Sequence, residues 1–160
     1  MIVTSGAIAF GKQLLYQQNM LSRSIRQTLK GGPKSFADPR ACSAAGQGGL
    51  IAMYETMFAQ YGVSCAQILV TKNDFKHRST VDNLRETINE LLIMNVIPII
   101  NENDAISPPG NVGADLEGVL SVTDNDSLAA NMAVQLNADL MIVLSDVDGI
   151  YKYVWFLWFV

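Results

Sequence analysis

The chain has 160 residues, of which 49% are hydrophobic and 16% are charged, so it is globular and long enough for one core. Its formal net charge of −4 argues against nucleic acid or an anionic membrane as the main partner. The only histidine is His77, and the two cysteines, Cys42 and Cys65, lack metal-ligand spacing. A His-based catalytic triad or a His-rich metal site is therefore not expected, and we predict that both cysteines are buried free thiols.

The apolar pattern predicts strands that alternate with helices. The expected strands are near-continuous apolar runs, which are typical of strands covered on both faces. We therefore predict an α/β fold, with an open, mostly parallel sheet sandwiched by helices. The expected strands are residues 2–3, 63–70, 96–100, 116–122 and 139–144, and the expected helices are 8–18, 39–61, 80–95 and 124–136.

Two of the expected helices carry further local signals. Helix 39–61 has Asp38 as its expected N-cap and Gly62 at its end. Its small residues at 44–49 weaken the helix and predict the close approach of another backbone. In helix 80–95, we expect one apolar face, made of Ile88, Leu91, Leu92 and Val96.

Small or polar residues follow each expected strand. The carboxyl ends of parallel strands share one edge of a sheet, so these residues predict a ligand site there. An isolated polar turn would mean little, but several on one edge favour a site. The polar exits are residues 5–6, 71–74, 101–104, 124–126 and 145–146.

The residue types at these exits suggest a zwitterionic ligand. Ser5 offers a hydroxyl beside the free N–H groups of a helix start, which suit a carboxylate or phosphate. Asn101, Asp104 and Asn125 offer acceptors for an ammonium group. An amino acid carries both groups. The alternative is ordinary helix capping by Ser5 and Asn125.

Acidic residues flank Asn125 at the expected start of a helix. Asp124 and Asp126 could cap that helix, or hold a metal-bound phosphate, or anchor lysines. Residues 146–149 begin like a calcium loop but lack its later acidic positions. The chain has no phosphate-binding Gly-x4-Gly-Lys-Ser/Thr sequence and no Gly-x-Ser-x-Gly elbow.

Five motifs, in order along nearly the whole chain, resemble those of the glutamate 5-kinases in the amino acid kinase family. They are Val3–Gly11, Ala44–Gln47, Pro98–Ala105, Asp124–Ala130 and Leu144–Gly149. Thr4, Phe10 and the segments 67–71 and 144–147 look closer to the kinase half of the animal bifunctional delta-1-pyrroline-5-carboxylate synthases than to stand-alone bacterial enzymes.

The resemblance implies ATP-dependent phosphorylation of the γ-carboxylate of L-glutamate, the first step toward proline and ornithine. ATP and Mg²⁺ are the implied cofactors, and the full-length protein is expected to be a homo-oligomer with no membrane span. No general base is needed, because a glutamate carboxylate with a pKa of about 4.3 is already ionised at neutral pH. The carried-over roles are glutamate binding by Ser5, Asp104 and Asn125, ATP contact by Ser145 and Asp146, and organisation of the catalytic lysines by Asp126.

The sequence also departs from this family. The family's two catalytic lysines match none of the lysines here, and residues 153–160 are an apolar tail that follows no family pattern. We therefore expect residues 1–152 to be a partial kinase domain, cut at both ends, that keeps the glutamate side without turnover. The alternatives are a non-catalytic fragment that binds glutamate or full-length subunits, and another family member acting on aspartate, acetylglutamate or a nucleoside monophosphate. The animal resemblance would imply a mitochondrial location, and otherwise a cytoplasmic one.

Overall fold

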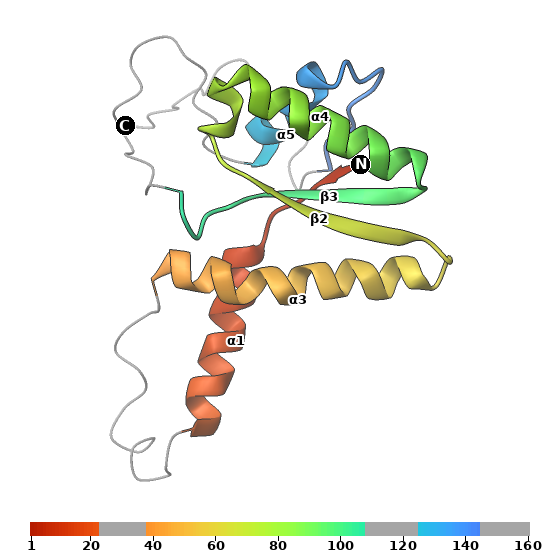
Figure 1. Ribbon diagram of the computed structural model, residues 1–160. Coiled ribbons are helices and arrows are strands. Elements are labelled where there is room, and N and C mark those ends of the chain that lie inside the picture. The colour runs from red at the N-terminus through yellow and green to blue at the C-terminus, as the bar shows by residue number, and fades with distance from the viewer. Residues whose placement is uncertain (23–37, 108–124, 145–160) are drawn as a thin grey trace, which may run out of the picture.

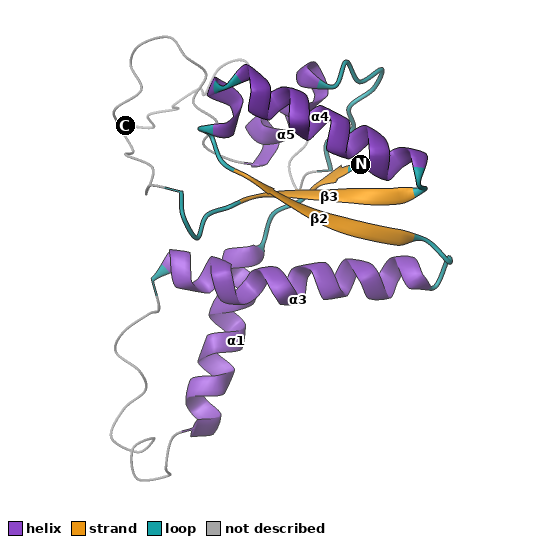
Figure 2. Cartoon of the chain, in the orientation of Figure 1, coloured by secondary structure: helices purple, strands orange, loops and turns teal. Residues whose placement is uncertain are grey.

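A computed structural model describes residues 1–22, 38–107 and 125–144 of the protein (Figures 1 and 2). Its elements alternate between strands and helices, as the sequence predicts. In chain order they are β1 (Ile2–Val3), α1 (Ala7–Ser22), α3 (Pro39–Ala59), β2 (Ser64–Val70), the 3-10 turn η1 (Asp74–Lys76), α4 (Arg78–Ile93), β3 (Val96–Glu102) and α5 (Asn125–Gln135). No helix in these described ranges is both long enough and apolar enough to cross a membrane.

The three strands form one parallel sheet in the order β1-β3-β2. The register aligns Val3 with Ile100, and Val70 with Glu102, so the strands end close to one another. Figure 1 shows α3 on one face of the sheet, with α1 packed against it, and α4 and α5 on the other face. The predicted α/β fold with a parallel sheet is confirmed.

One expected strand does not form. Residues 139–144 contain no strand, and Ile142 and Leu144 are 74% and 92% exposed. A strand needs a neighbouring backbone that accepts and donates its hydrogen bonds. No described strand pairs with this run, so its apolar sequence alone does not make it part of the sheet. The other expected strand, 116–122, lies outside the described residues.

Helix α3 begins as predicted. The Asp38 carboxylate accepts a hydrogen bond from the Arg40 backbone N–H at 2.8 Å, and Pro39 occupies the first turn. The Arg40 guanidinium also donates to this carboxylate, at 2.7 Å. These hydrogen bonds, that of the guanidinium most of all, lower the pKa of Asp38 to about 2. After the helix, Gly62 has a φ of +66°, a conformation that favours glycine.

Helices α1 and α3 cross at glycines, as the small residues at 44–49 predict. A Cβ atom added to Gly46 would overlap the carbonyl oxygen of Ala7, and one added to Gly11 would overlap that of Cys42. The backbones are therefore in direct contact. Cys42 is buried and Cys65 half-buried, and both are free thiols. The expectation of a buried thiol is confirmed for Cys42, whereas Cys65 keeps some exposure.

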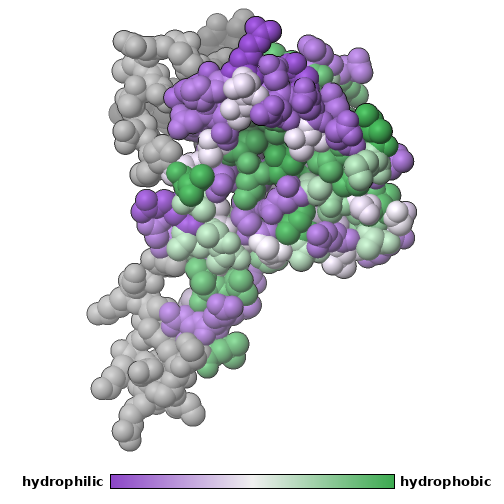
Figure 3. Space-filling model, viewed as in Figure 1, coloured by the Kyte–Doolittle hydropathy of each residue, from purple (hydrophilic) through white to green (hydrophobic). Residues whose placement is uncertain are grey.

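The opposite face of the sheet holds the aliphatic core. This aliphatic cluster consists of Val70, Ile88, Ile100, Leu128 and Met132. It joins β2, β3, α4 and α5, while the outer surface of α4 is hydrophilic in the view of Figure 3.

The prediction of one apolar face on helix 80–95, which corresponds to α4, is correct only in part. Ile88 is fully buried, and Leu91 is half-buried. Leu92 is 46% exposed, and Val96 already belongs to β3. The buried stripe extends instead toward Val81, seven residues before Ile88.

Candidate amino-acid-binding site

The site lies at the carboxyl edge of the sheet, where the parallel strands end. The Thr4 backbone N–H donates to the Ile100 carbonyl at 2.9 Å and continues the pairing of β1 with β3. Ser5 therefore leaves β1 beside the last residues of β3, and it is exposed. Gly6 follows with a φ of +103°, which turns the chain directly into α1.

The hydroxyl of Thr4 links the end of β1 to helix α3. It lies 2.9 Å from the hydroxyl of Tyr54 on α3, and Thr4 itself is buried. A hydrogen bond thus joins the residue before Ser5 to the helix that covers this face. This hydrogen bond could not be predicted from the sequence, because the two residues are 50 positions apart.

A tight turn after β3 presents Asp104. The Asn103 backbone N–H donates to the Val70 carbonyl at 2.8 Å, which ties the start of the turn to β2. The Asn103 carbonyl then accepts from the backbone N–H groups of Ile106 and Ser107, at 3.2 and 3.0 Å. With both ends of the turn hydrogen-bonded, Asp104 projects from a defined backbone.

Asp104 is a half-buried carboxylate with a hydroxyl partner. The hydroxyl of Ser43, a buried residue of α3, donates to its Oδ2 atom at 3.4 Å. Burial raises the pKa of Asp104 above its ordinary value of 3.8, and the Ser43 hydrogen bond opposes that rise. A cationic ligand group at this carboxylate would favour its charged form.

Helix α3 also connects β2 with β3 through glutamine side chains. The Gln67 amide on β2 donates to Gln47 Oε1 at 2.9 Å, and the Gln47 amide donates to the Glu102 carbonyl at 3.4 Å. Sequence reasoning missed Ser43 and Gln47 as site residues. The available signal was their position within or beside the Ala44–Gln47 motif.

Two buried amide atoms at this edge lack partners among the described residues. Asn101 is only 2% exposed, and its Oδ1 accepts from the Glu102 backbone N–H at 2.8 Å, but its Nδ2 has no partner. Asn125 Oδ1 is likewise buried without a partner. An unpaired buried polar atom costs free energy, so a ligand that pairs with it gains affinity. One orphan is a donor and the other an acceptor, which suits a ligand that carries both charges.

Helix α5 brings the remaining described candidates to the sheet. It contacts β1 and β3, and it begins at half-buried Asn125, with exposed Asp126 in its first turn. The carboxylate of Asp126 is therefore near the positive end of the helix dipole. Ser145 and Asp146, the expected ATP contacts, lie outside the described residues. Within the described ranges, no three His, Cys, Asp or Glu residues are grouped as metal ligands would be.

Comparison with known proteins decides the family. The model of the amino acid kinase family matches residues 1–153. The chain belongs to the amino acid kinase family. Like the fold expected for this family, the structure has a parallel α/β sheet, and its polar strand exits fall within the matched region.

Within this family, the chain is similar to delta-1-pyrroline-5-carboxylate synthases and to a glutamate 5-kinase. The chain is 46% identical over 151 residues to the delta-1-pyrroline-5-carboxylate synthase of Solanum lycopersicum, covering 94% of this chain and 20% of that protein. It is 43% identical over 150 residues to synthase A of Arabidopsis thaliana, with the same coverage of 94% and 20%. It is 39% identical over 150 residues to glutamate 5-kinase of Thermoanaerobacter sp. (strain X514), covering 94% of this chain and 35% of that protein.

The chain thus spans about a fifth of the length of the plant synthases that it matches. The resemblance to glutamate 5-kinases and bifunctional synthases is confirmed. The finer resemblance to animal synthases stays a prediction, because these relatives are from plants and a bacterium.

Proposed function

We propose that this amino acid kinase provides the glutamate-binding part of an enzyme that phosphorylates the γ-carboxylate of L-glutamate with ATP. This reaction is the first step of proline and ornithine synthesis. The names of the synthase and glutamate 5-kinase relatives support the proposal. The polar groups at the carboxyl edge of the sheet support it independently, because they match an amino acid.

The observation that carries the proposal is the environment of Asp104. A carboxylate that is half-buried beside one hydroxyl, with a raised pKa, gains most from a cationic partner. The α-ammonium group of glutamate is such a partner. In this proposal Asn125 adds its unpaired Oδ1 to the same ammonium group, and Ser5 donates to a carboxylate.

Phosphoryl transfer to glutamate depends on alignment and positive charge more than on proton transfer. The γ-carboxylate attacks in its ionised form, and ATP supplies the phosphoryl group. Ser145 and Asp146 are the proposed contacts for ATP, and Asp126 is proposed to organise the catalytic lysines. Mg²⁺ belongs to the same proposal, and within the described residues no three His, Cys, Asp or Glu side chains are grouped around a site for it. Apart from Asp126, the part taken by the described site residues is therefore to hold the acceptor.

Calorimetric titration of the chain with L-glutamate tests this proposal, using N-acetylglutamate and glutarate as comparison ligands. Both comparison ligands keep two carboxylates but lack the ammonium group, so we expect them to bind at least about tenfold more weakly. Asp104→Asn should weaken glutamate binding by about two orders of magnitude, because it removes the partner charge. Asp139→Asn, the same change at an exposed residue, is the matched control.

Equal binding of glutamate and N-acetylglutamate would contradict the proposal and favour an acetylated acceptor. Glutamate binding that survives Asp104→Asn would contradict the role of Asp104. Formation of glutamyl phosphate from ATP is a separate measurement. We expect none from this chain alone, and robust turnover would refute that expectation.

A further inference from the structure

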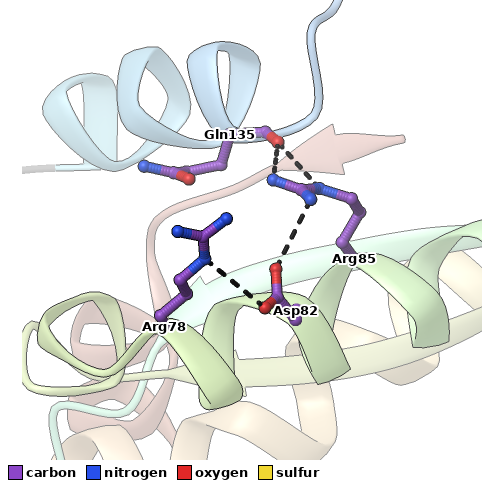
Figure 4. A network of polar contacts seen from close by, with 4 residues as sticks. All are labelled: Arg78, Asp82, Arg85 and Gln135. Atoms are coloured by element: carbon purple, nitrogen blue, oxygen red, sulfur yellow. Dashed lines mark hydrogen bonds and ion pairs between the residues drawn. The ribbon is translucent and has the colours of Figure 1, made fainter.

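Helix α5 is fixed at its carboxyl end by an arginine from α4. The backbone carbonyl of Gln135, the last residue of α5, accepts from Arg85 Nε at 3.1 Å and from Arg85 Nη2 at 2.9 Å (Figure 4). The last carbonyls of a helix have no partner within the helix and carry its negative dipole end. The Arg85 guanidinium supplies hydrogen-bond donors for the terminal carbonyl and a positive charge for the negative end of the dipole.

The apolar packing of α5 does not fix its direction in the same way. Its buried residues are Leu128 and Met132, which are one turn apart on one face. They pack into the aliphatic cluster, and apolar packing is not directional. The planar fork of an arginine, in contrast, defines where the carbonyl must lie.

Arg85 is itself held in place on α4. Its Nη1 lies 3.5 Å from Asp82 Oδ1, and the side chains of both residues are partly exposed. Asp82 also lies 4.0 Å from Arg78, whose side chain is 97% exposed. One turn beyond Arg85 on the same helix, Ile88 is fully buried in the aliphatic cluster. The anchor therefore rests on a helix that is fixed to the core.

We propose that Arg85 is a positioning residue for the amino-acid site. The eleven residues of α5 form a rod about 16 Å long, with the Arg85 contact at one end and Asn125 and Asp126 at the other. A rod held at its carboxyl end keeps its amino end in place over the sheet. The proposal rests on the proposed function, because Asn125 matters only if it contacts the ligand.

The test compares Arg85→Met, Arg85→Lys and the control Arg78→Met, which removes a highly exposed arginine that pairs with Asp82 in the same network. Glutamate affinity is measured by calorimetry at a temperature where circular dichroism shows each variant folded. We expect Arg85→Met to weaken binding about tenfold and Arg85→Lys to weaken it about threefold, since lysine keeps the charge but loses the fork. Arg78→Met should stay within about twofold of the original chain.

A double-mutant cycle separates positioning from general stability. In an Asn125→Ala background, Arg85→Met should change glutamate affinity less than about twofold, because the contact that it positions is already gone. An equal loss of affinity in both backgrounds would overturn the proposal. So would full glutamate affinity in folded Arg85→Met or, if that variant does not fold, in Arg85→Lys.

A ligand-free readout keeps this test distinct from that of the proposed function. Hydrogen exchange of the backbone amides at the start of α5 should quicken in Arg85→Met and stay unchanged in Arg78→Met. If the original chain does not bind glutamate, the proposed function fails, whereas faster exchange would still support the anchor. Unchanged exchange at the start of α5 would overturn the anchor whatever the chain binds.

Discussion

The two faces of the sheet are built from different chemistry. Toward α4 and α5, most of the buried residues belong to the aliphatic cluster. Toward α1 and α3, buried polar residues occur beside glycines in direct backbone contact, and these polar residues are Thr4, Ser43, Gln47 and Asn101. Two neighbouring residues of β3 illustrate the difference between the faces. Ile100 belongs to the aliphatic cluster, and the next residue, Asn101, points to the opposite face because side chains alternate along a strand.

This difference separates stability from recognition. Apolar packing can lose a methyl group and keep its arrangement, although the fold becomes less stable. A face held by hydrogen bonds and backbone contacts depends on the exact course of the chain, because those contacts are directional or very close. We therefore expect changes on the α1 and α3 face to disturb ligand binding more than changes of equal energetic cost within the aliphatic cluster.

The largest expected effect comes from Gly46→Ala. The added methyl group would overlap backbone atoms of α1, so we expect the free energy of unfolding to fall by about 3 kcal/mol. Gly48→Ala is the matched control, because a Cβ atom there meets nothing within 4 Å. That control should gain about 0.5 kcal/mol from helix propensity. Urea unfolding measures both variants, and an equal result for the two would contradict the close crossing of α1 and α3.

Tyr54→Phe is expected to have a smaller effect on stability and a visible one on binding. It removes the hydrogen bond to Thr4 and should cost about 1 kcal/mol. Because Thr4 directly precedes Ser5, we also expect glutamate affinity to fall about threefold, measured by calorimetry. Unchanged affinity would mean that this contact does not position Ser5.

Ile88→Val is the counterpart on the aliphatic face. Ile88 is fully buried, and the loss of one methylene group should also cost about 1 kcal/mol in urea unfolding. In contrast to Tyr54→Phe, we expect glutamate affinity to remain within about twofold of the original chain. A matching loss of affinity in the two variants would break the distinction between the faces.

The sequence predicted those features that depend on neighbours along the chain. The Asp38 cap, the helix end at Gly62 and the predicted strands 63–70 and 96–100 follow from local patterns that the structure confirms. Strand β3 is longer than predicted, because Asn101 and Glu102, expected in the polar exit, still belong to it. The close helix crossing could also be predicted, because glycines destabilise a helix and their presence at 44–49 therefore indicates a second backbone nearby. The polar residues after the strands also predicted a site at the carboxyl edge of the sheet, because the ends of parallel strands share that edge.

Features that depend on distant partners could not be read in this way. Ser43 reaches Asp104 across 61 positions, and Arg85 reaches Gln135 across 50. A serine in a helix of small residues and an arginine on an amphipathic helix look like ordinary surface or packing residues in the sequence. The apolar run 139–144 failed as a strand for a related reason, since pairing depends on a partner that the run itself does not reveal.

The pH dependence of glutamate binding tests the central role of Asp104 most directly. Burial raises the pKa of Asp104 above 3.8, so the folded chain holds this proton more tightly than the unfolded chain does. Its ionisation therefore costs stability as the pH rises from 3.8 through the raised value, and Asp104→Asn should melt at a higher temperature at neutral pH. Only the ionised carboxylate attracts an ammonium group.

Calorimetric titrations with glutamate between about pH 4 and pH 8, on the original chain and on Asp104→Asn, measure this directly. Glutamate's own titration is common to both chains, so their difference isolates Asp104. We predict that affinity of the original chain falls as the pH drops through the raised pKa, while Asp104→Asn binds weakly throughout. Identical affinities and pH profiles for the two chains would contradict the account.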